Sequence, residues 1–268
     1  MQRFLAFSGV ALAVMMGAAR AGVVITAQTD SGGDKSHADT IYLEPDRMRQ
    51  NAGSGAEMIY RADLKKVWMV HDADHTYREM DPESMQAMRT QMEAAMAQMR
   101  ERMQSMPEEQ RKRMESLMGS ADKAPPKPAS YEKAGPPKKI GQWTCTPYRV
   151  QDGASGNEEF CVARMSDVGL KPADLQAFES LGKFMQQMMP TGAGAAARPV
   201  ALDIAGLSKA VGYDAVPIQM SRLGDDGKVE YQTTVTKVER QSIAANLFEV
   251  PAGYAKQAMP MMPGARQQ

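Results

Sequence analysis

Residues that carry most enzyme chemistry are scarce in this chain. Its 268 residues include two cysteines and three histidines, and 32 basic and 32 acidic side chains give a formal net charge of zero. A balanced charge offers no electrostatic attraction for a phosphate backbone, so we expect no nucleic acid as a partner. The motifs G-x-S-x-G and H-E-x-x-H, a P-loop and a strand-bound G-x-G-x-x-G are absent from the sequence. We therefore expect no enzyme and no cofactor.

Long apolar runs are also lacking. The longest, Phe4 to Met16, is shorter than the roughly 20 residues that a membrane-spanning helix needs. It follows Arg3 and precedes the small-residue site Ala19-Arg20-Ala21, an order typical of a secretory signal peptide over residues 1–21. No cysteine stands at the cleavage point to accept a lipid. We expect a mature protein that is periplasmic or secreted and does not span the membrane.

Both cysteines lie in one predicted hairpin. Cys145 and Cys161 flank a strand, a Gly/Asn-rich turn and a second strand. Exported proteins keep disulfides, and pairing across this hairpin would stabilise the fold by about 3 kcal/mol in the loop-entropy model. The spacing is not the Cys-x-x-Cys that lowers a thiol pKa, which argues against a redox or metal role. We expect a structural disulfide.

Short runs of β-branched and aromatic residues, separated by turn residues, indicate strands on both sides of a helical region. The predicted strands are residues 23–29, 37–45, 47–51, 56–62, 66–71, 75–80, 143–150, 158–165, 215–223 and 228–240. Strands joined this closely must be antiparallel. The predicted fold class is α+β: one domain over residues 22–255, built on one curved antiparallel β-sheet, a half-barrel, with amphipathic helices over its concave face. A split into two domains at the linker is the alternative.

The segments between these strands are predicted from caps and composition. Asp81-Pro82-Glu83 supplies an N-cap, a proline at the first helical position and an acid, and so begins a methionine-rich helical insertion over residues 81–118. Proline and lysine in residues 119–140 indicate an exposed linker. Residues 256–268 are expected to be a disordered tail. Residues 172–189 predict an amphipathic helix with one apolar face, formed by Leu175, Phe178, Leu181, Met185 and Met188.

Seven methionines occupy the twenty-two positions from Met85 to Met106. Spaced by three or four residues, they fall within an arc of about 80° on a helix. Such a stripe must be covered, and three interpretations stay open. The stripe packs in the protein's own core, where flexible thioethers fill irregular gaps. It forms an adaptable lid over a hydrophobic ligand or a partner helix. It binds Cu(I) or Ag(I) through its sulfur atoms.

The histidines offer a weaker metal hypothesis. His71 and His75 flank Asp72-Ala73-Asp74, so two imidazoles with neighbouring carboxylates could bind Zn²⁺ or Cu²⁺ across a three-residue loop. Polar residues at the tip of a hairpin are common without any metal. His37 stands alone in a strand-like segment, where a surface or packing role is the default.

Six motifs support a resemblance to a known family. They are TIYLEPDRMRQ, HTYREMD, GQWTCTPYRV, LQAFESLGKFMQQMM, VPIQMSR and NLFEVPAGY. Together they resemble a bacterial exported family classed as domain of unknown function 4412, in the company of LolA/LolB-like lipoprotein-carrier folds. The resemblance implies a sheet wrapped around an apolar cavity, a shape that similar carriers use for acyl chains. No catalytic residues come with it.

Together these observations predict an exported, non-enzymatic binding protein that holds a hydrophobic or lipid-like ligand in the cavity of a curved sheet. The predicted ligand-binding residues are Met88, Met92, Met96, Met99, Met103, Leu175, Phe178 and Met185. One alternative is a methionine-rich periplasmic protein for Cu(I) or Ag(I). Another is a cell-envelope protein that docks an unknown protein partner through the methionine stripe.

Overall fold

A large antiparallel sheet dominates the computed structural model, which describes residues 20–32, 35–53, 55–104, 107–108, 130–151, 157–188, 203–224 and 226–258. Within these ranges, thirteen strands form the sheet, in the order β13-β6-β5-β4-β3-β2-β1-β12-β11-β10-β9-β7, with β8 paired to β9. The first six strands are β1 (Arg20–Ser31), β2 (Lys35–Glu44), β3 (Arg47–Asn51), β4 (Ala56–Arg61), β5 (Lys66–His71) and β6 (Thr76–Met80). The others are β7 (Ser130–Lys133), β8 (Lys138–Ile140), β9 (Trp143–Gln151), β10 (Glu158–Arg164), β11 (Ala215–Leu223), β12 (Val229–Ile243) and β13 (Ala255–Gln257).

The pairing of β1 with β12 joins the two halves of the chain. Their ladder runs from Arg20 opposite Ile243 to Ser31 opposite Tyr231. On either side, short turns connect antiparallel neighbours, as the close spacing of the predicted strands requires. The prediction of one open, mostly antiparallel sheet with a few helices is therefore confirmed. Residues 1–19 of the predicted signal peptide lie outside the described residues, and Arg20 and Ala21 belong to β1.

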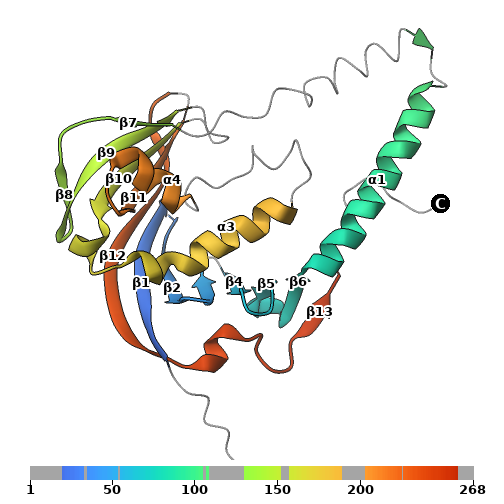
Figure 1. Cartoon of the computed structure of the whole chain (residues 1–268), viewed down its shortest axis with the longest axis horizontal. Coiled ribbons are helices and arrows are strands. Elements are labelled where there is room, and N and C mark those ends of the chain that lie inside the picture. Colours follow the sequence, from blue (N-terminus) through green and yellow to red (C-terminus); the bar gives the residue numbers. More distant parts are fainter. Residues whose placement is uncertain are drawn as a thin grey trace, which may run out of the picture.

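Alternation along the strands divides the apolar side chains between two faces. In β5, Val67 and Met69 contact the cluster on the concave face, while Trp68 and Val70 belong to a cluster on the convex face. The concave cluster is covered by α3 (Gln176–Met188), which runs across the inner side of the sheet (Figure 1). The 3-10 turn η5 (Ala245–Phe248) covers the convex cluster with Phe248. The sheet is thus covered on both faces near its middle.

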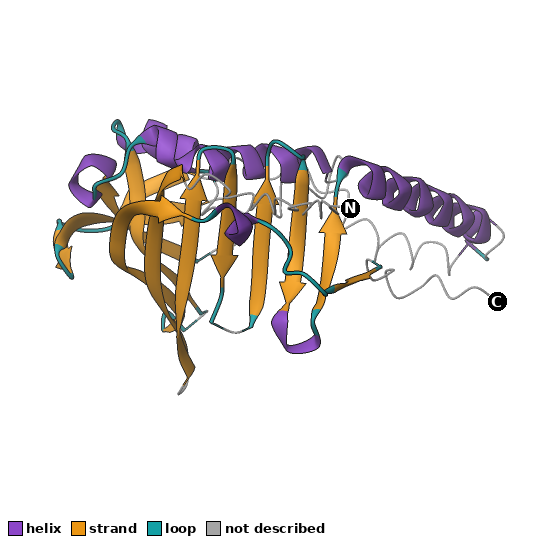
Figure 2. Ribbon diagram, turned by 90° about the horizontal axis from the view of Figure 1, so that it is seen from below, coloured by secondary structure: helices purple, strands orange, loops and turns teal. Residues whose placement is uncertain are grey.

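The methionine helix, α1 (Pro82–Gln104), differs from the prediction. It starts directly after β6 and projects beyond the last strands of the sheet (Figures 1 and 2). Met85 packs against the concave cluster, Met88 is half-buried, and the side chain of Met99 is 46% exposed. The described part of α1 therefore extends the concave face at one edge and does not lie across it.

Four other elements occur where the sequence predicted none. The described part of the predicted linker contains β7 and β8, both paired with β9. β13 lies at the start of the predicted tail and pairs in parallel with β6. A short helix, α4 (Ile204–Val211), begins where Asp203 accepts a hydrogen bond from the Gly206 amide at 3.0 Å. Prolines flank these edge strands without interrupting them, which is where an edge strand tolerates proline.

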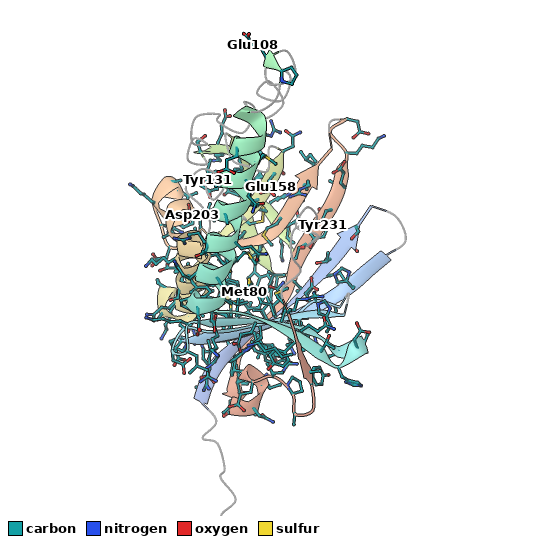
Figure 3. The ribbon with its side chains drawn as sticks, turned by 90° about the vertical axis from the view of Figure 1, so that its right-hand side faces the viewer. Met80, Glu108, Tyr131, Glu158, Asp203 and Tyr231 are labelled. Carbon is teal, nitrogen blue, oxygen red and sulfur yellow. A yellow bond between two sulfur atoms is a disulfide. The ribbon has the colours of Figure 1, made fainter. Side chains whose placement is uncertain are left out.

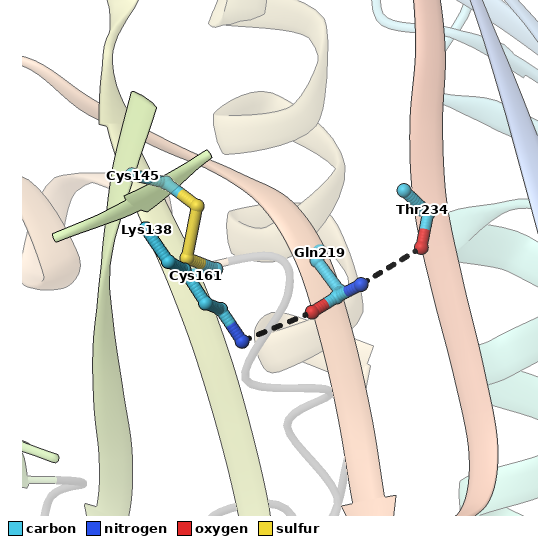
Figure 4. Close-up of a disulfide and its surroundings, with 5 residues drawn as sticks. All are labelled: Lys138, Cys145, Cys161, Gln219 and Thr234. Carbon is cyan, nitrogen blue, oxygen red and sulfur yellow. Dashed lines mark hydrogen bonds between the residues drawn. A yellow bond between two sulfur atoms is a disulfide. The ribbon is translucent and has the colours of Figure 1, made fainter. Parts of the chain in front are cut away.

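The predicted disulfide is confirmed. Cys145 of β9 and Cys161 of β10 are bonded, and both are buried in the concave cluster (Figure 4). Beside them, Lys138 donates to Gln219 at 3.4 Å, and Gln219 donates to Thr234 at 3.2 Å. These hydrogen bonds connect β8 to β11 and β12 next to the disulfide. Among the described residues, no helix has the length and apolar character needed to cross a membrane.

Candidate functional site

Half-buried apolar side chains of β4, β5, β6, α1 and α3 pack against the cluster on the concave face. Each packs against the buried concave cluster but keeps part of its surface exposed. They come from three strands and two helices, and we call this set the methionine surface: Met58, Met69, Met80, Met85, Phe178 and Met185. Figure 3 marks Met80 where β6 passes into α1. The feature that distinguishes this region is incomplete burial of large, mostly flexible side chains.

Strand register aligns part of this surface. Met58 of β4 lies directly opposite Met69 of β5, and Met69 lies opposite Arg78 of β6. Side chains paired in this way on one face are about 4.5–5.5 Å apart at their Cβ atoms. One row of the concave face therefore runs from Met58 through Met69 to a cation at Arg78.

The next row is more deeply covered. It contains Tyr60, Val67 and Met80, in which Tyr60 and Val67 are buried and Met80 is half-buried. The ring of Tyr60 contacts Phe184 of α3, with 5.9 Å between centroids. Burial raises the pKa of the Tyr60 hydroxyl, so this phenol stays neutral. The aromatic contact anchors α3 next to the methionine surface.

The start of α1 is held by a reciprocal cap. The Ser84 amide donates to Asp81 Oδ1 at 2.8 Å, and the Asp81 amide donates to Ser84 Oγ at 3.0 Å. The hydrogen bonds from Ser84 lower the pKa of the Asp81 carboxyl. Because the cap follows β6 directly, it places Met85 against the concave cluster near the end of β6. Thus the predicted helix start is confirmed, and it positions one residue of the site.

The predicted ligand-binding residues have different environments. Leu175 is 2% exposed and belongs to the core, whereas Phe178 and Met185 lie on the methionine surface. Met88 is half-buried and Met99 is exposed. The side chains of Met92, Met96 and Met103 lie outside the described residues. The sequence prediction missed Met58, Met69 and Met80, although strict alternation in their strands placed them on the face of the core residues.

Polar side chains border this surface on β5 and β6. Arg78 Nη1 lies 3.4 Å from His71 Nε2, and Arg78 Nη2 donates to Gln257 Oε1 at 3.1 Å. His75 instead contacts the ring of Tyr254 edge-on at 5.2 Å. The two histidines proposed as metal ligands therefore have separate partners. Among the described residues, no group of three or more His, Cys, Asp or Glu side chains is arranged to hold a metal ion.

A second polar cluster has a structural explanation. Thr29 donates to Asp39 Oδ2 at 2.5 Å and shares a 2.9 Å hydrogen bond with Thr233, and all three residues are buried. The Gly53 amide donates to Asp39 Oδ1 at 3.2 Å, and His37 Nε2 lies 3.4 Å from the same oxygen. Both oxygens of the buried carboxylate are thus satisfied, as a stable interior requires.

No family model and no curated protein matches this chain, so the resemblance to the family of unknown function stays a prediction. Solved structures with a similar arrangement include an uncharacterized conserved protein from Thermus thermophilus. It has a TM-score of 0.44 and 9% identity, over 88% of this chain and 90% of that one.

Two further similar structures are of MucB. In the complex of MucA and MucB from Pseudomonas aeruginosa, the TM-score is 0.38 at 10% identity, over 87% of this chain and 56% of that one. MucB alone has a TM-score of 0.38 at 10% identity, over 86% and 57%. This chain therefore spans little more than half the length of these MucB chains. At such TM-scores and identities, the likenesses assign no function to it.

Proposed function

We propose that this chain is an exported binding protein that holds a hydrophobic or lipid-like molecule on the methionine surface. The observation that carries the proposal is that six half-buried apolar side chains from β4, β5, β6, α1 and α3 pack against one concave cluster and keep part of their surface exposed. Covering apolar surface contributes about 25 cal/mol per Å², so a ligand that completes their burial gains affinity directly.

The residue types favour a ligand of variable shape. Five of the six members are methionines, whose unbranched thioether side chains repack around different partners. A rigid core would instead use Leu, Ile and Phe, as the buried part of α3 and the turn before it do with Leu175, Leu181 and Phe184. The disulfide supports the exported location, because such bonds persist in oxidising compartments.

Lipid extraction and native mass spectrometry of protein purified from the periplasm test this proposal. We expect co-purified lipid in the native protein and uptake of a fluorescent fatty acid by the delipidated protein. Substituting Met69→Glu should weaken uptake at least tenfold, because a negative charge would then stand beside Met58 in the row that runs from Met58 to Arg78. The control is Leu64→Glu, at a residue that is 47% exposed in the turn after β4.

A conservative double variant separates lipid binding from thioether chemistry. Met58→Leu with Met69→Leu keeps the apolar volume and removes two sulfur atoms. We expect lipid uptake to be retained. In the unsubstituted protein, the absence of co-purified lipid together with the absence of fatty-acid uptake would contradict the proposal. Loss of uptake in the leucine variant, accompanied by loss of Cu(I) binding, would point to sulfur ligation instead.

A further inference from the structure

We infer that the ligand of the methionine surface is a long-chain carboxylate whose charged end binds Arg78. This inference rests on the proposed function and adds the chemical class of the ligand. It requires a cation on the concave face, a donor available on that cation, and an apolar path leading away from it.

Alternation in β6 places Arg78 on the concave face. Tyr77 belongs to the convex cluster, and Glu79 accepts a 2.7 Å hydrogen bond from Nε1 of Trp68, a member of that same cluster. Residues 76, 78 and 80 therefore share the opposite face, where Met80 contacts the concave cluster. Arg78 lies directly opposite Met69 and beside Met80 on its own strand. Its guanidinium is thus at the border of the methionine surface.

One N–H donor of the Arg78 guanidinium is unpaired among the described residues. Its two Nη atoms face His71 and Gln257, while Nε is buried and has no hydrogen-bond partner within the described ranges. A buried donor left unpaired costs about 1–3 kcal/mol. A carboxylate that accepts from this Nε would remove that penalty through a charge-assisted hydrogen bond.

The charge of Arg78 also lacks a counterion among its described contacts. Neither of its hydrogen-bond partners is a carboxylate. On the same half of the sheet, each of Arg47, Arg49 and Arg61 pairs with an acid within hydrogen-bond distance. The neighbouring Glu79 lies on the other face, where it binds Lys66 and Lys256. Charge complementarity at this position therefore favours a ligand with one negative charge.

The apolar path sets the length of the ligand. Neighbouring strands lie about 4.8 Å apart, so the row from Arg78 across Met69 to Met58 covers roughly 10 Å. Phe178 and Met185 of α3 pack against the same concave cluster as Met58 and Met69. An acyl chain spans this distance, whereas a small carboxylate does not reach the second methionine. A fatty-acid anion combines the required charge with the required tail.

Competition between two ligands with the same tail tests the inference. Delipidated full-length protein is loaded with a neutral fluorescent probe, which is displaced with palmitate or with hexadecanol at about pH 7.5, where a carboxyl group is ionised. We expect palmitate to displace the probe at a concentration at least tenfold lower than hexadecanol. Arg78→Gln should abolish this preference, because palmitate then displaces the probe no better than hexadecanol.

Two matched variants distinguish loss of the carboxylate site from loss of the folded structure. Arg222→Gln removes an exposed arginine of β11 that pairs with Glu158 of β10. This variant should keep the full preference for palmitate. Arg78→Lys keeps the charge but loses the Nε donor, so an intermediate preference is expected even where Arg78→Gln fails to fold.

The outcomes separate the inference from the proposed function. Equal displacement by palmitate and hexadecanol would overturn the carboxylate site while leaving hydrophobic binding intact. Stronger displacement by dipalmitoyl phosphatidylglycerol than by palmitate would overturn it in favour of a phosphodiester. Failure of all three ligands to displace the probe would contradict both proposals.

Discussion

The helices α1 and α3 both carry large apolar residues spaced by three or four positions, but their apolar side chains are buried to different degrees. α3 runs across the concave face, where Leu181 is 2% exposed and Phe184 is 8% exposed (Figure 1). α1 leaves the edge of the sheet, and its Met99 is 46% exposed. Equal periodicity therefore does not produce equal burial. Large branched and aromatic side chains secure α3, whereas the stripe of α1 consists of methionine.

The attachments of the two helices differ as well. The turn before α3, η3 (Pro172–Leu175), is tied to β12, because Arg240 Nη1 donates to Asp174 Oδ1 at 3.0 Å. α1 follows an edge region of the sheet, where its N-terminal cap and Met85 hold the first turn. Within the described residues, these contacts hold α1 at its first turn, whereas α3 contacts β2 and β3 on the concave face. We therefore expect α1 to rearrange more readily than α3.

The largest expected difference between the helices lies in their contribution to stability. Leu181→Ala should lower the free energy of unfolding by about 2–5 kcal/mol, because it leaves a cavity in the core. Met99→Ala should change it by less than about 0.5 kcal/mol, since the side chain is exposed. Urea denaturation of both variants measures the contrast. Similar losses in both would show that α1 packs along its length.

Removing the disulfide tests the buried side of this comparison. Cys145 and Cys161 lie in the cluster that α3 covers. Replacing both with serine should cost about 3 kcal/mol, as expected for a loop closed by residues 16 apart. Near-ultraviolet circular dichroism and denaturation detect the effect. A loss below about 1 kcal/mol would mean that the strands around the disulfide are held by packing alone.

The cap of α1 should have a smaller effect. Asp81→Ala removes the acceptor of the Ser84 amide, and loss of such a cap costs about 1 kcal/mol. Because α1 projects beyond the last strands of the sheet (Figure 1) and its Met99 is exposed, we expect a lower helical circular-dichroism signal with little change in the cooperative unfolding of the sheet. The control, Glu83→Gln, keeps the cap intact. A full loss of sheet signal would contradict this independence.

The smallest effect concerns pH. At Asp174, burial acts to raise the carboxyl pKa, but the hydrogen bonds from Arg240 and from the Lys171 amide outweigh it and lower the pKa below its ordinary value. The pKa of Asp81 is lowered as well, by its hydrogen bonds to Ser84. A lowered folded-state pKa gives stability that is complete above the unfolded value and is lost as pH falls through the folded value.

Both helix anchors should therefore weaken below about pH 4, the unfolded value for aspartate. Unfolding free energies measured from about pH 6 down to about pH 2.5 should decline less steeply in Asp174→Asn and in Asp81→Asn than in the unsubstituted protein. An unchanged pH dependence in both variants would show that other carboxyls govern acid unfolding.

Local signals predicted many of the elements correctly. The short apolar run of β5, the Asp81-Pro82 helix start and the cysteine pair can all be recognised from a few neighbouring residues. Asp203 and Gly212 also carried a usable cap signal for α4, since Gly212 adopts a φ of +81° at its end. β7 and β13 were missed because they are only three or four mostly polar residues long and form strands only beside β9 and β6.

The sequence by itself determined most of the strands, the cap of α1, the disulfide and the periodicity of both helices, because each depends on contacts between near neighbours. Tertiary structure decided that α3 lies across the sheet, that α1 projects from its edge, and that Arg78 stands in one row with Met69 and Met58. Strand register and the direction in which a helix leaves a sheet depend on residues far apart in the chain. Apolar periodicity predicts that one face of a helix is covered. Only the assembled sheet shows which of these faces stay partly exposed to solvent.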